Sequence, residues 1–184
     1  MANSLTLKAP AKINLFLDIL GQLHNGYHSL FMLMQTVSLC DTITIRLTEN
    51  GVSLTCSNPD LPTDGRNIAH RAAELFFAET GIKSGAEIHI EKRIPFQAGL
   101  GGGSADAAAV LRGLCRLCGD FGKERLPELA LRLGSDVPYC LTGGTAIAMN
   151  RGEVLAPLRP LGQRHCVIIK PAQGVSTAEA YGAY

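Results

Sequence analysis

The sequence has no long apolar run and no excess of charge of one sign. Its 184 residues contain no stretch of about 18 consecutive apolar residues, the length that a membrane-spanning helix needs. Lysine and arginine number 17 against 16 acidic residues, and nucleic-acid-binding proteins carry clustered basic residues instead. The first residues hold no apolar segment of the kind found in a signal peptide. We therefore expect a one-domain cytoplasmic protein with neither a membrane nor a nucleic acid as partner.

The six cysteines lack the spacing of a metal site. Cys115 and Cys118 form a C-x-x-C pair, but no second pair follows, as a zinc site of this type requires. The pair falls near the predicted end of a helix, whereas redox pairs lie at helix N-termini, where the thiol pKa is lowered. The other four stand singly in apolar, strand-like surroundings: Cys40, Cys56, Cys140 and Cys166. We expect free cysteines that pack as small hydrophobic residues.

Glycine is concentrated in one short segment. Residues 95–104 read PFQAGLGGGS and lead directly into the apolar stretch 105–118. Glycine has no Cβ and adopts positive φ readily, so successive backbone N–H groups can converge on an anion. The first turn of a helix adds unpaired N–H groups and the positive end of the helix dipole. We predict a phosphate-binding loop with Ser104 as the N-cap of the helix, and a flexible linker is the alternative.

Two common phosphate-binding motifs are absent from this segment. No lysine follows the glycines, as it does in the P-loop. The spacing of Gly99 and Gly101 approaches the dinucleotide-binding fingerprint, but Ser104 occupies the place of its third glycine. The loop therefore predicts nucleotide phosphate binding by neither of these routes.

Strands dominate the first half of the chain and helices alternate with strands in the second. Period-two alternation predicts strands at 5–8, 13–20, 33–39, 42–48, 52–56, 86–93, 145–149 and 167–170. Turns are predicted at Asn25-Gly26 and Asn50-Gly51, the latter joining 42–48 to 52–56 as a hairpin. Helical spacing predicts helices at 67–80 and 123–133 besides the one after the glycine loop. This order favours an α+β fold.

Lys12 and Asp136 are the best candidates for handling the charge of phosphoryl transfer. Lys12 stands at the start of an apolar strand, and Asp136 stands in the turn GSDVP. A carboxylate can take the proton of an acceptor hydroxyl while an ammonium stabilises the developing charge. A turn-forming aspartate and a lysine that extends into water are the alternatives, since spacing alone does not bring the two together.

Four segments together resemble the 4-diphosphocytidyl-2-C-methyl-D-erythritol kinases. This family belongs to the superfamily of galactokinase, homoserine kinase, mevalonate kinase and phosphomevalonate kinase. The segments are PAKINLFL from Pro10, GYHSL from Gly26, GLGGGSADAA from Gly99 and GSDVP from Gly134. The glycine loop alone indicates only the superfamily, whereas the combination indicates the kinase. The resemblance implies a two-lobed α+β fold whose N-terminal lobe resembles the second domain of ribosomal protein S5.

The resemblance also implies a reaction and its residues. The family transfers phosphate from ATP to the 2-hydroxyl of 4-diphosphocytidyl-2-C-methyl-D-erythritol, in the non-mevalonate route to isoprenoid precursors. Asp136 matches the catalytic base and Lys12 the lysine that assists it. Asn14, Tyr27, His28 and Tyr181 match the substrate site, where the two tyrosines would sandwich the cytosine ring.

The implied cofactors are ATP and Mg²⁺. Residues that match the ATP site are Pro95, Gly99, Leu100, Gly101, Gly102, Gly103 and Ser104 around the phosphates, and Asn67, Ile68 and Lys92 near adenine. Ser104 would also reach the metal ion. Asp106 would repel a triphosphate, so we expect its carboxylate to point sideways or to act through the metal.

The family's chains are longer and carry a second lobe with a further glycine-rich segment, and this sequence stops at Tyr184 without one. We therefore expect residues 1–160 to form the N-terminal kinase lobe and residues 161–184 to begin a C-terminal lobe that is largely absent. The alternatives are another small-molecule kinase of the superfamily and a non-catalytic nucleotide-binding fragment. We expect a monomer or a weak homodimer.

Overall fold

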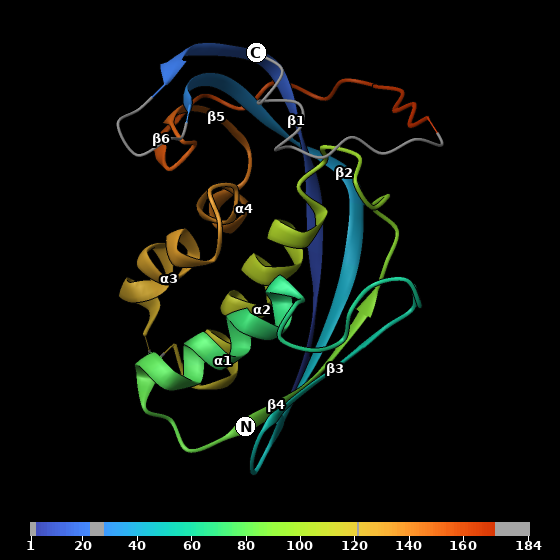
Figure 1. The fold of residues 1–184 in the computed structure, drawn as a ribbon, viewed down its shortest axis with the longest axis vertical. Coiled ribbons are helices and arrows are strands. Elements are labelled where there is room, and N and C mark those ends of the chain that lie inside the picture. The colour runs from blue at the N-terminus through green and yellow to red at the C-terminus, as the bar shows by residue number, and fades with distance from the viewer. Residues whose placement is uncertain (1–2, 23–27, 121, 172–184) are drawn as a thin grey trace.

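A six-stranded sheet covered on one face by helices forms the fold (Figure 1). The computed structural model describes residues 3–22, 28–120 and 122–171. The longest strands are β1 (Ser4–Gln22) and β2 (His28–Thr48), which pair antiparallel. Their register shifts at three places along the pair. Such bulges bend strands and increase their twist, and both strands curve across the molecule (Figure 1).

The other edge of β2 carries two different neighbours. β4 (Gly85–Glu91) pairs with the C-terminal half of β2, and β5 (Thr145–Asn150) pairs with its N-terminal half. β3 (Val52–Cys56) pairs parallel with β4, and β6 (Val154–Pro157) pairs antiparallel with β5. The chain passes from β3 to the parallel β4 through α1 (Ile68–Thr80), so the sheet is mixed.

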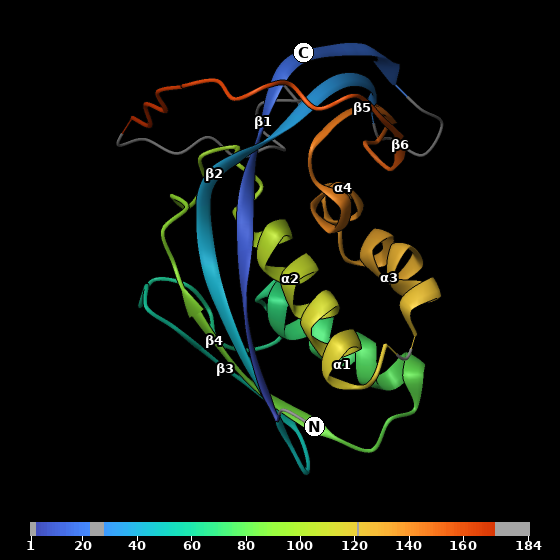
Figure 2. The ribbon, with the colours of Figure 1, turned by 180° about the vertical axis from the view of Figure 1, so that it is seen from behind.

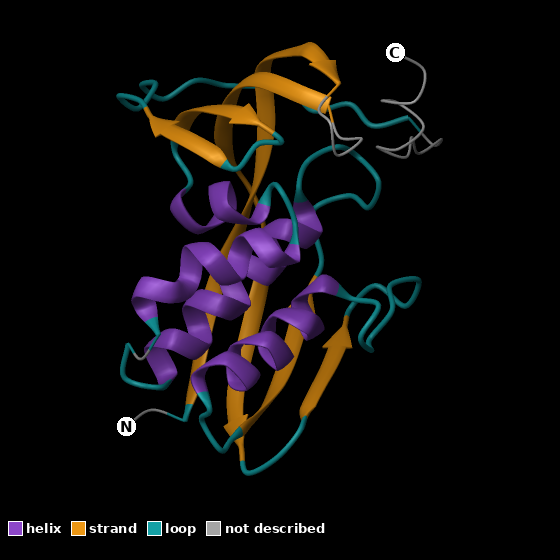
Figure 3. Cartoon of the chain, turned by 60° about the vertical axis from the view of Figure 1, so that its left-hand side comes forward, coloured by secondary structure: helices purple, strands orange, loops and turns teal. Residues whose placement is uncertain are grey.

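The helices form a layer on one face of the sheet (Figure 3). They are α1, α2 (Gly102–Leu117), the short 3-10 helix η1 (Lys123–Arg125), α3 (Leu126–Leu133) and α4 (Val137–Thr142). The central helix is α2, which contacts β1, β2 and the three other α-helices. A Cβ at Gly113 would lie 2.4 Å from Ile45 Cδ1 and 2.8 Å from Leu7 Cδ1, so α2 approaches the sheet as closely as a glycine permits.

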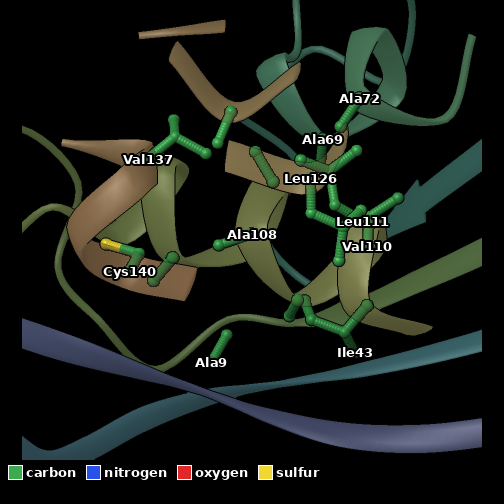
Figure 4. Packing of buried hydrophobic residues seen from close by; sticks show 14 of the residues in the cluster. Ala9, Ile43, Ala69, Ala72, Ala108, Val110, Leu111, Leu126, Val137 and Cys140 are labelled. Carbon is green, nitrogen blue, oxygen red and sulfur yellow. The ribbon is translucent and has the colours of Figure 1, made fainter. Parts of the chain in front are cut away.

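The core lies between α2 and the sheet. Ile43 and Ile45 of β2 face the helices and are fully buried, as are Val110 and Leu111 of α2. Figure 4 shows Ile43 close to Val110 and Leu111. Burial of each such side chain stabilises the fold by about 1.5–3 kcal/mol. This packing fixes the start of α2, and with it the glycine loop, relative to β1 and β2.

The α+β prediction is confirmed, but the predicted hairpin of 42–48 with 52–56 is wrong. β4 lies between these strands, because the turn at Asn50-Gly51 bonds to β4 instead: Ala86 N–H donates to the Gly51 carbonyl at 2.9 Å. Gly85 permits this approach, since a Cβ there would overlap the Gly51 oxygen. The chain is thereby directed to the outer edge of β4.

Other element predictions differ in their limits. The strands predicted at 5–8 and 13–20 are one strand, β1, and those at 33–39 and 42–48 are one strand, β2. The helix predicted at 123–133 is divided into η1 and α3, at whose start Pro127 lies. The turn predicted at Asn25-Gly26 lies outside the described residues.

The strand predicted at 167–170 is wrong. Residues 158–171 form no regular element and cross the far part of β1 and β2 as an extended segment (Figures 1 and 2). Val167 and Ile169 are 87% and 85% exposed, so no described strand pairs with this segment to bury them. Apolar alternation without a partner strand does not make a strand.

Candidate active site

Three residues with positive φ shape the glycine loop. They are Gln97 (φ 53°), Gly99 (φ 69°) and Gly101 (φ 67°), and alternation of this kind turns successive N–H groups toward one side. Gly101 is the N-cap of α2, and no side chain caps that helix. The N–H groups of the first turn of α2 are therefore available to an anion, which the helix dipole also favours.

The prediction of Ser104 as the N-cap is wrong, because α2 already begins at Gly102. Ser104 lies in the first turn, partly exposed, and its hydroxyl has no hydrogen-bond partner among the described residues. That oxygen is free to bind a ligand.

A cavity of about 490 Å³ opens beside the loop. Most of the predicted site residues line it: Lys12, Asn14, Ile68, Lys92, Pro95, Gly99, Leu100, Gly101, Gly102, Gly103, Ser104 and Asp136. Leu30, Met32, Phe96, Gln97, Ala98 and Arg151 line it as well. Lys12, Lys92, Arg151 and Asp136 are its ionisable lining residues.

The structure brings Lys12 and Asp136 together. Lys12 Nζ lies 3.4 Å from Asp136 Oδ2 and 3.4 Å from Asn14 Oδ1. The Lys12 side chain is 8% exposed, and its backbone N–H donates to the Leu100 carbonyl at 3.0 Å. Asp136 is 31% exposed and caps no N–H group of α4, so one side of its carboxylate faces the cavity. A carboxylate, an ammonium and an anion-binding loop therefore share one cavity.

Helix α4 holds Asp136 in place through Tyr139. The Tyr139 side chain is buried, and its hydroxyl donates to the Gly144 carbonyl at 2.7 Å. Thr36 of β2 completes the link, since its N–H also donates to Gly144 O and its hydroxyl lies 3.1 Å from the Tyr139 hydroxyl. Asp136 precedes the first residue of this short, anchored helix, so its carboxylate has a defined position opposite Lys12.

A buried cluster of three ionisable side chains lies under the loop. Lys92 Nζ donates to Asp41 Oδ2 at 2.5 Å and to Asp106 Oδ2 at 2.7 Å. Burial raises the pKa of Asp106 to about 8, against the opposing effect of Lys92. Burial alone would lower the pKa of Lys92, but the two carboxylates outweigh it and raise that pKa. Asp106 points sideways into this cluster, which is one of the two placements expected for it.

Some predicted site residues lie elsewhere. Asn67 caps α1 by accepting from Ala69 N–H at 2.9 Å, and it does not line the cavity. His28 begins β2, and it does not line the cavity either. Tyr27 and Tyr181 lie outside the described residues. The roles of these four residues stay predictions.

Asp41 is the residue that sequence reasoning missed. It stands on the buried face of β2 in the alternation Asp41, Ile43, Ile45, where a hydrophobic residue is expected. An acid at such a position needs buried partners, and this was the available signal. Arg151 also lines the cavity, in a turn after β5, and no local sequence pattern indicates that it belongs to the site.

Within the three described segments, no group of three or more His, Cys, Asp or Glu side chains could hold a metal ion. The same part of the chain has no helix that is both long and apolar enough to cross a membrane. All six cysteines are free, as predicted, and burial raises the pKa of Cys140 to about 12. Cys140 lies in α4 and Cys166 is exposed outside any strand, so the strand-like surroundings predicted for these two are wrong.

Comparison with known proteins places this geometry in a family. Residues 67–144 match the N-terminal domain of the GHMP kinases. The chain is 46% identical over 181 residues to a 4-diphosphocytidyl-2-C-methyl-D-erythritol kinase of Clostridium botulinum, covering 98% of this chain and 65% of the relative. It is 50% identical to the enzyme of the same name from Synechococcus sp., covering 97% of this chain and 58% of the relative. The chain therefore spans less than two thirds of the length of these curated relatives.

Solved structures agree with this assignment. A crystal structure of 4-(cytidine 5'-diphospho)-2C-methyl-D-erythritol kinase superposes with a TM-score of 0.68 at 42% identity, covering 84% of this chain and 55% of that one. A homoserine kinase from Cytophaga hutchinsonii superposes with a TM-score of 0.61 at 23% identity, covering 80% of this chain and 49% of that one, and shows the shared fold alone. Nearly the whole chain is thus similar to part of the 4-diphosphocytidyl-2-C-methyl-D-erythritol kinases, and its residues 67–144 match the N-terminal domain of the GHMP kinases.

Proposed function

We propose that this chain supplies the ATP-binding loop and the catalytic pair of a kinase that phosphorylates the 2-hydroxyl of 4-diphosphocytidyl-2-C-methyl-D-erythritol. The observation that carries the proposal is the Lys12–Asp136 pair, 3.4 Å apart, in the cavity that the glycine loop lines. Relatives that carry the name of this activity, at 46% and 50% identity, support the choice of substrate.

ATP binds with its phosphates against the glycine loop. The uncapped first turn of α2 and the positive-φ residues Gln97, Gly99 and Gly101 offer backbone N–H groups to the phosphate oxygens. Ile68, Pro95 and Phe96 line the same cavity with apolar surface for the adenine ring, and Lys92 lines that side of the site as well. A role for Asn67 near adenine rests on the family resemblance alone. Phe96 lines the cavity and is 55% exposed, so its ring is accessible to a ligand.

Phosphoryl transfer uses Asp136 as the base. Asp136 accepts the proton of the 2-hydroxyl as that oxygen forms its bond to the γ-phosphorus, and the bond from the γ-phosphorus to the bridging oxygen breaks to release ADP. The Lys12 ammonium, 3.4 Å from the Asp136 carboxylate, stabilises the charge that develops on the transferred group.

The substrate occupies the side of the cavity away from the loop. Asn14 lines the cavity beside Lys12 and is the described residue best placed to orient the methylerythritol hydroxyls. Tyr27 and Tyr181 stack on the cytosine ring and His28 bonds to its edge, as the family resemblance implies. These three assignments rest on the resemblance.

Mg²⁺ fits the donor atoms that are present. This ion is bound through one or two protein oxygens together with phosphate oxygens and water, so it does not need a cluster of acidic residues. The Ser104 hydroxyl lines the cavity and has no partner in the described part of the chain, which leaves it available to the ion. When bound, the ion would neutralise charge on the β- and γ-phosphates.

The proposal includes the organisation and location of the protein. Residues 1–160 form the N-terminal lobe of the kinase, supported by the family match over residues 67–144, and residues 161–184 begin a second lobe. A cytoplasmic location agrees with six cysteines that are all free. The protein acts as a monomer or a weak homodimer.

The test is ATP consumption by this chain with Mg²⁺ and 4-diphosphocytidyl-2-C-methyl-D-erythritol, beside the variants Asp136→Asn and Asp60→Asn. Loss of the general base is expected to lower kcat by about 10²–10⁴-fold. Asp60 is exposed and does not line the cavity, so the control variant is expected to keep full activity. ATP affinity, measured with a fluorescent analogue, is expected to be unchanged in Asp136→Asn.

Homoserine and mevalonate serve as alternative substrates in the same assay. Turnover of either in preference to the cytidyl compound would contradict the substrate and favour another kinase of the superfamily. A folded chain that binds ATP without any turnover would be a non-catalytic nucleotide-binding fragment.

A further inference from the structure

The glycine loop begins and ends at one buried group of ionisable side chains. Residues 95–101 lie between the segment that leaves β4 and the start of α2, and both ends of this loop contact the cluster formed by Asp41, Lys92 and Asp106. Asp41 is 0% exposed and Asp106 is 3% exposed. Burial of polar and ionisable groups is costly unless they bind one another, so the presence of these two carboxyl groups calls for a reason beyond packing.

Asp41 fixes the entrance of the loop. Its Oδ1 accepts from Arg93 N–H at 2.5 Å and from Ile94 N–H at 2.8 Å, and its Oδ2 accepts from Lys92 Nζ. One carboxylate therefore binds three successive residues at the point where β4 has ended. Ile94 is itself buried in a small cluster with Ala11 and Leu100, directly beneath the loop.

Lys92 fixes the exit of the loop. Its ammonium bonds to Asp106 of α2, and a Cβ at Gly102 would lie 3.1 Å from Lys92 Nζ. The lysine thus reaches across from β4 and lies under the first residue of the helix. Its backbone is fixed as well, because Lys92 N–H donates to Ser57 Oγ at 2.8 Å.

We propose that Asp41 and Asp106 are positioning residues for nucleotide binding, which act through Lys92 to hold the two ends of the glycine loop at the spacing that a phosphate group requires. This inference rests on the proposed function. Neither carboxylate lines the cavity, so neither touches the nucleotide. The clasp, as we call Asp41, Lys92 and Asp106, joins β2, the end of β4 and α2, three elements whose relative placement sets the loop.

The proposal predicts a specific loss of ATP affinity. Asp41→Asn keeps the size of the side chain but replaces the carboxylate that binds Lys92, and Asp106→Asn replaces the second carboxyl group that bonds to Lys92. A hydrogen bond to a charged group is lost or weakened in each, and we expect the Kd and KM for ATP to rise on the order of tenfold. The KM for the cytidyl substrate and kcat at saturating ATP are expected to change by less than about threefold, because Lys12 and Asp136 keep their places.

The effect of combining the two substitutions on the Kd for ATP shows whether Asp41 and Asp106 act together or independently. If both carboxylates act through Lys92, the double variant Asp41→Asn/Asp106→Asn raises the Kd by less than the product of the two single effects. Ile45→Val is the matched control, since it lies on the same strand as Asp41, is fully buried and costs about 0.5–1.5 kcal/mol of stability. Its Kd for ATP is expected to equal that of the original chain.

Amide hydrogen exchange of the nucleotide-free chain tests the clasp without any reliance on kinase activity. Exchange of the amides at residues 99–103 is expected to accelerate in Asp41→Asn and Asp106→Asn, and to stay unchanged in Ile45→Val. Unchanged exchange in both carboxylate variants would overturn the clasp even if the chain is an active kinase. Faster exchange in a chain that binds no ATP would leave the clasp as a structural device and overturn both its role in nucleotide binding and the proposed function.

Discussion

Single residues decide how closely the Lys12 side chain approaches the glycine loop. Gly101 has φ of 67°, and a Cβ there would lie 2.9 Å from Lys12 Cγ and 3.2 Å from Lys12 Cε. Gly99 has nearly the same backbone, with φ of 69°, but a Cβ there would meet no atom within 4 Å. The two glycines therefore share a conformational role and differ in their contact with Lys12.

We predict that Gly101→Ala lowers kcat by at least about tenfold and that Gly99→Ala does not. Both changes place alanine in the left-handed region, at a cost of about 1–3 kcal/mol, which denaturant unfolding would measure. Only Gly101→Ala also displaces Lys12, whose ammonium then moves relative to Asp136. Equal kcat values for the two variants would show that the close approach of Lys12 has no role in the reaction.

The residues of the site differ in how readily local sequence patterns predict them. Residues 99–104 form a compact glycine-rich pattern that is typical of phosphate binding, so the sequence alone predicts the loop. Lys12 and Asp136 are 124 positions apart in the numbering, and only the packing of α4 against β2 through Tyr139 brings them to 3.4 Å. Asp41 interrupts a buried alternation, but its partners lie on β4 and α2 and no local pattern identifies them.

Among the secondary structure elements, α1 is joined to η1 and α3 by one carboxylate. Glu79 of α1 accepts from Arg125 at 2.8 Å and from Arg132 at 2.7 Å, and it is 27% exposed. The hydrogen bonds from Arg132 and then Arg125 lower the pKa of Glu79 below its ordinary value of 4.5. Because the folded state favours the ionised form, these contacts stabilise the fold above about pH 4.5, and this contribution is lost as the pH falls through the lowered pKa.

We therefore predict that Glu79→Gln lowers the free energy of unfolding at neutral pH, and that the difference from the original chain shrinks as the pH falls toward 3. Urea unfolding at a series of pH values would measure it. Glu124→Gln is the control, because Glu124 is exposed and forms no ion pair with a described cation. A difference for Glu79→Gln that persists at low pH would mean that lost packing, and not charge, causes the effect.

Local patterns predicted the helices and strands better than they predicted the pairing of strands. The alternation of Val52–Cys56 correctly predicts β3, and the helical spacing over 67–80 correctly predicts α1. Whether β3 pairs with β2 or β4 depends on Gly85, whose missing Cβ leaves room for the Gly51 carbonyl to accept from Ala86 N–H. Contacts of this kind depend on tertiary packing, so neighbouring residues in the sequence do not encode them.

At the scale of the whole molecule, β1 is an exposed and apolar edge. Among the described strands it pairs only with β2, so the backbone groups of its outer side have no strand beside them. Its far part carries Leu15, Phe16, Leu17 and Leu20, exposed by 47, 51, 39 and 63%. Edge strands with these properties associate with other chains unless charge or cover prevents it.

We predict that this chain self-associates through β1 and that Leu20→Lys weakens the association. A charge on the edge opposes strand pairing between chains, while the exposed position keeps the free energy of unfolding within about 0.5 kcal/mol. Ser53→Lys is the matched control: it adds the same charge on β3, the opposite edge, where exposed positions are polar. Sedimentation velocity over a concentration series would measure both, and the Ser53→Lys chain is expected to associate as the original does. An original chain that stays monomeric at the highest concentration would contradict self-association. Equal weakening by both lysines would mean that net charge or another surface, and not β1, governs the association.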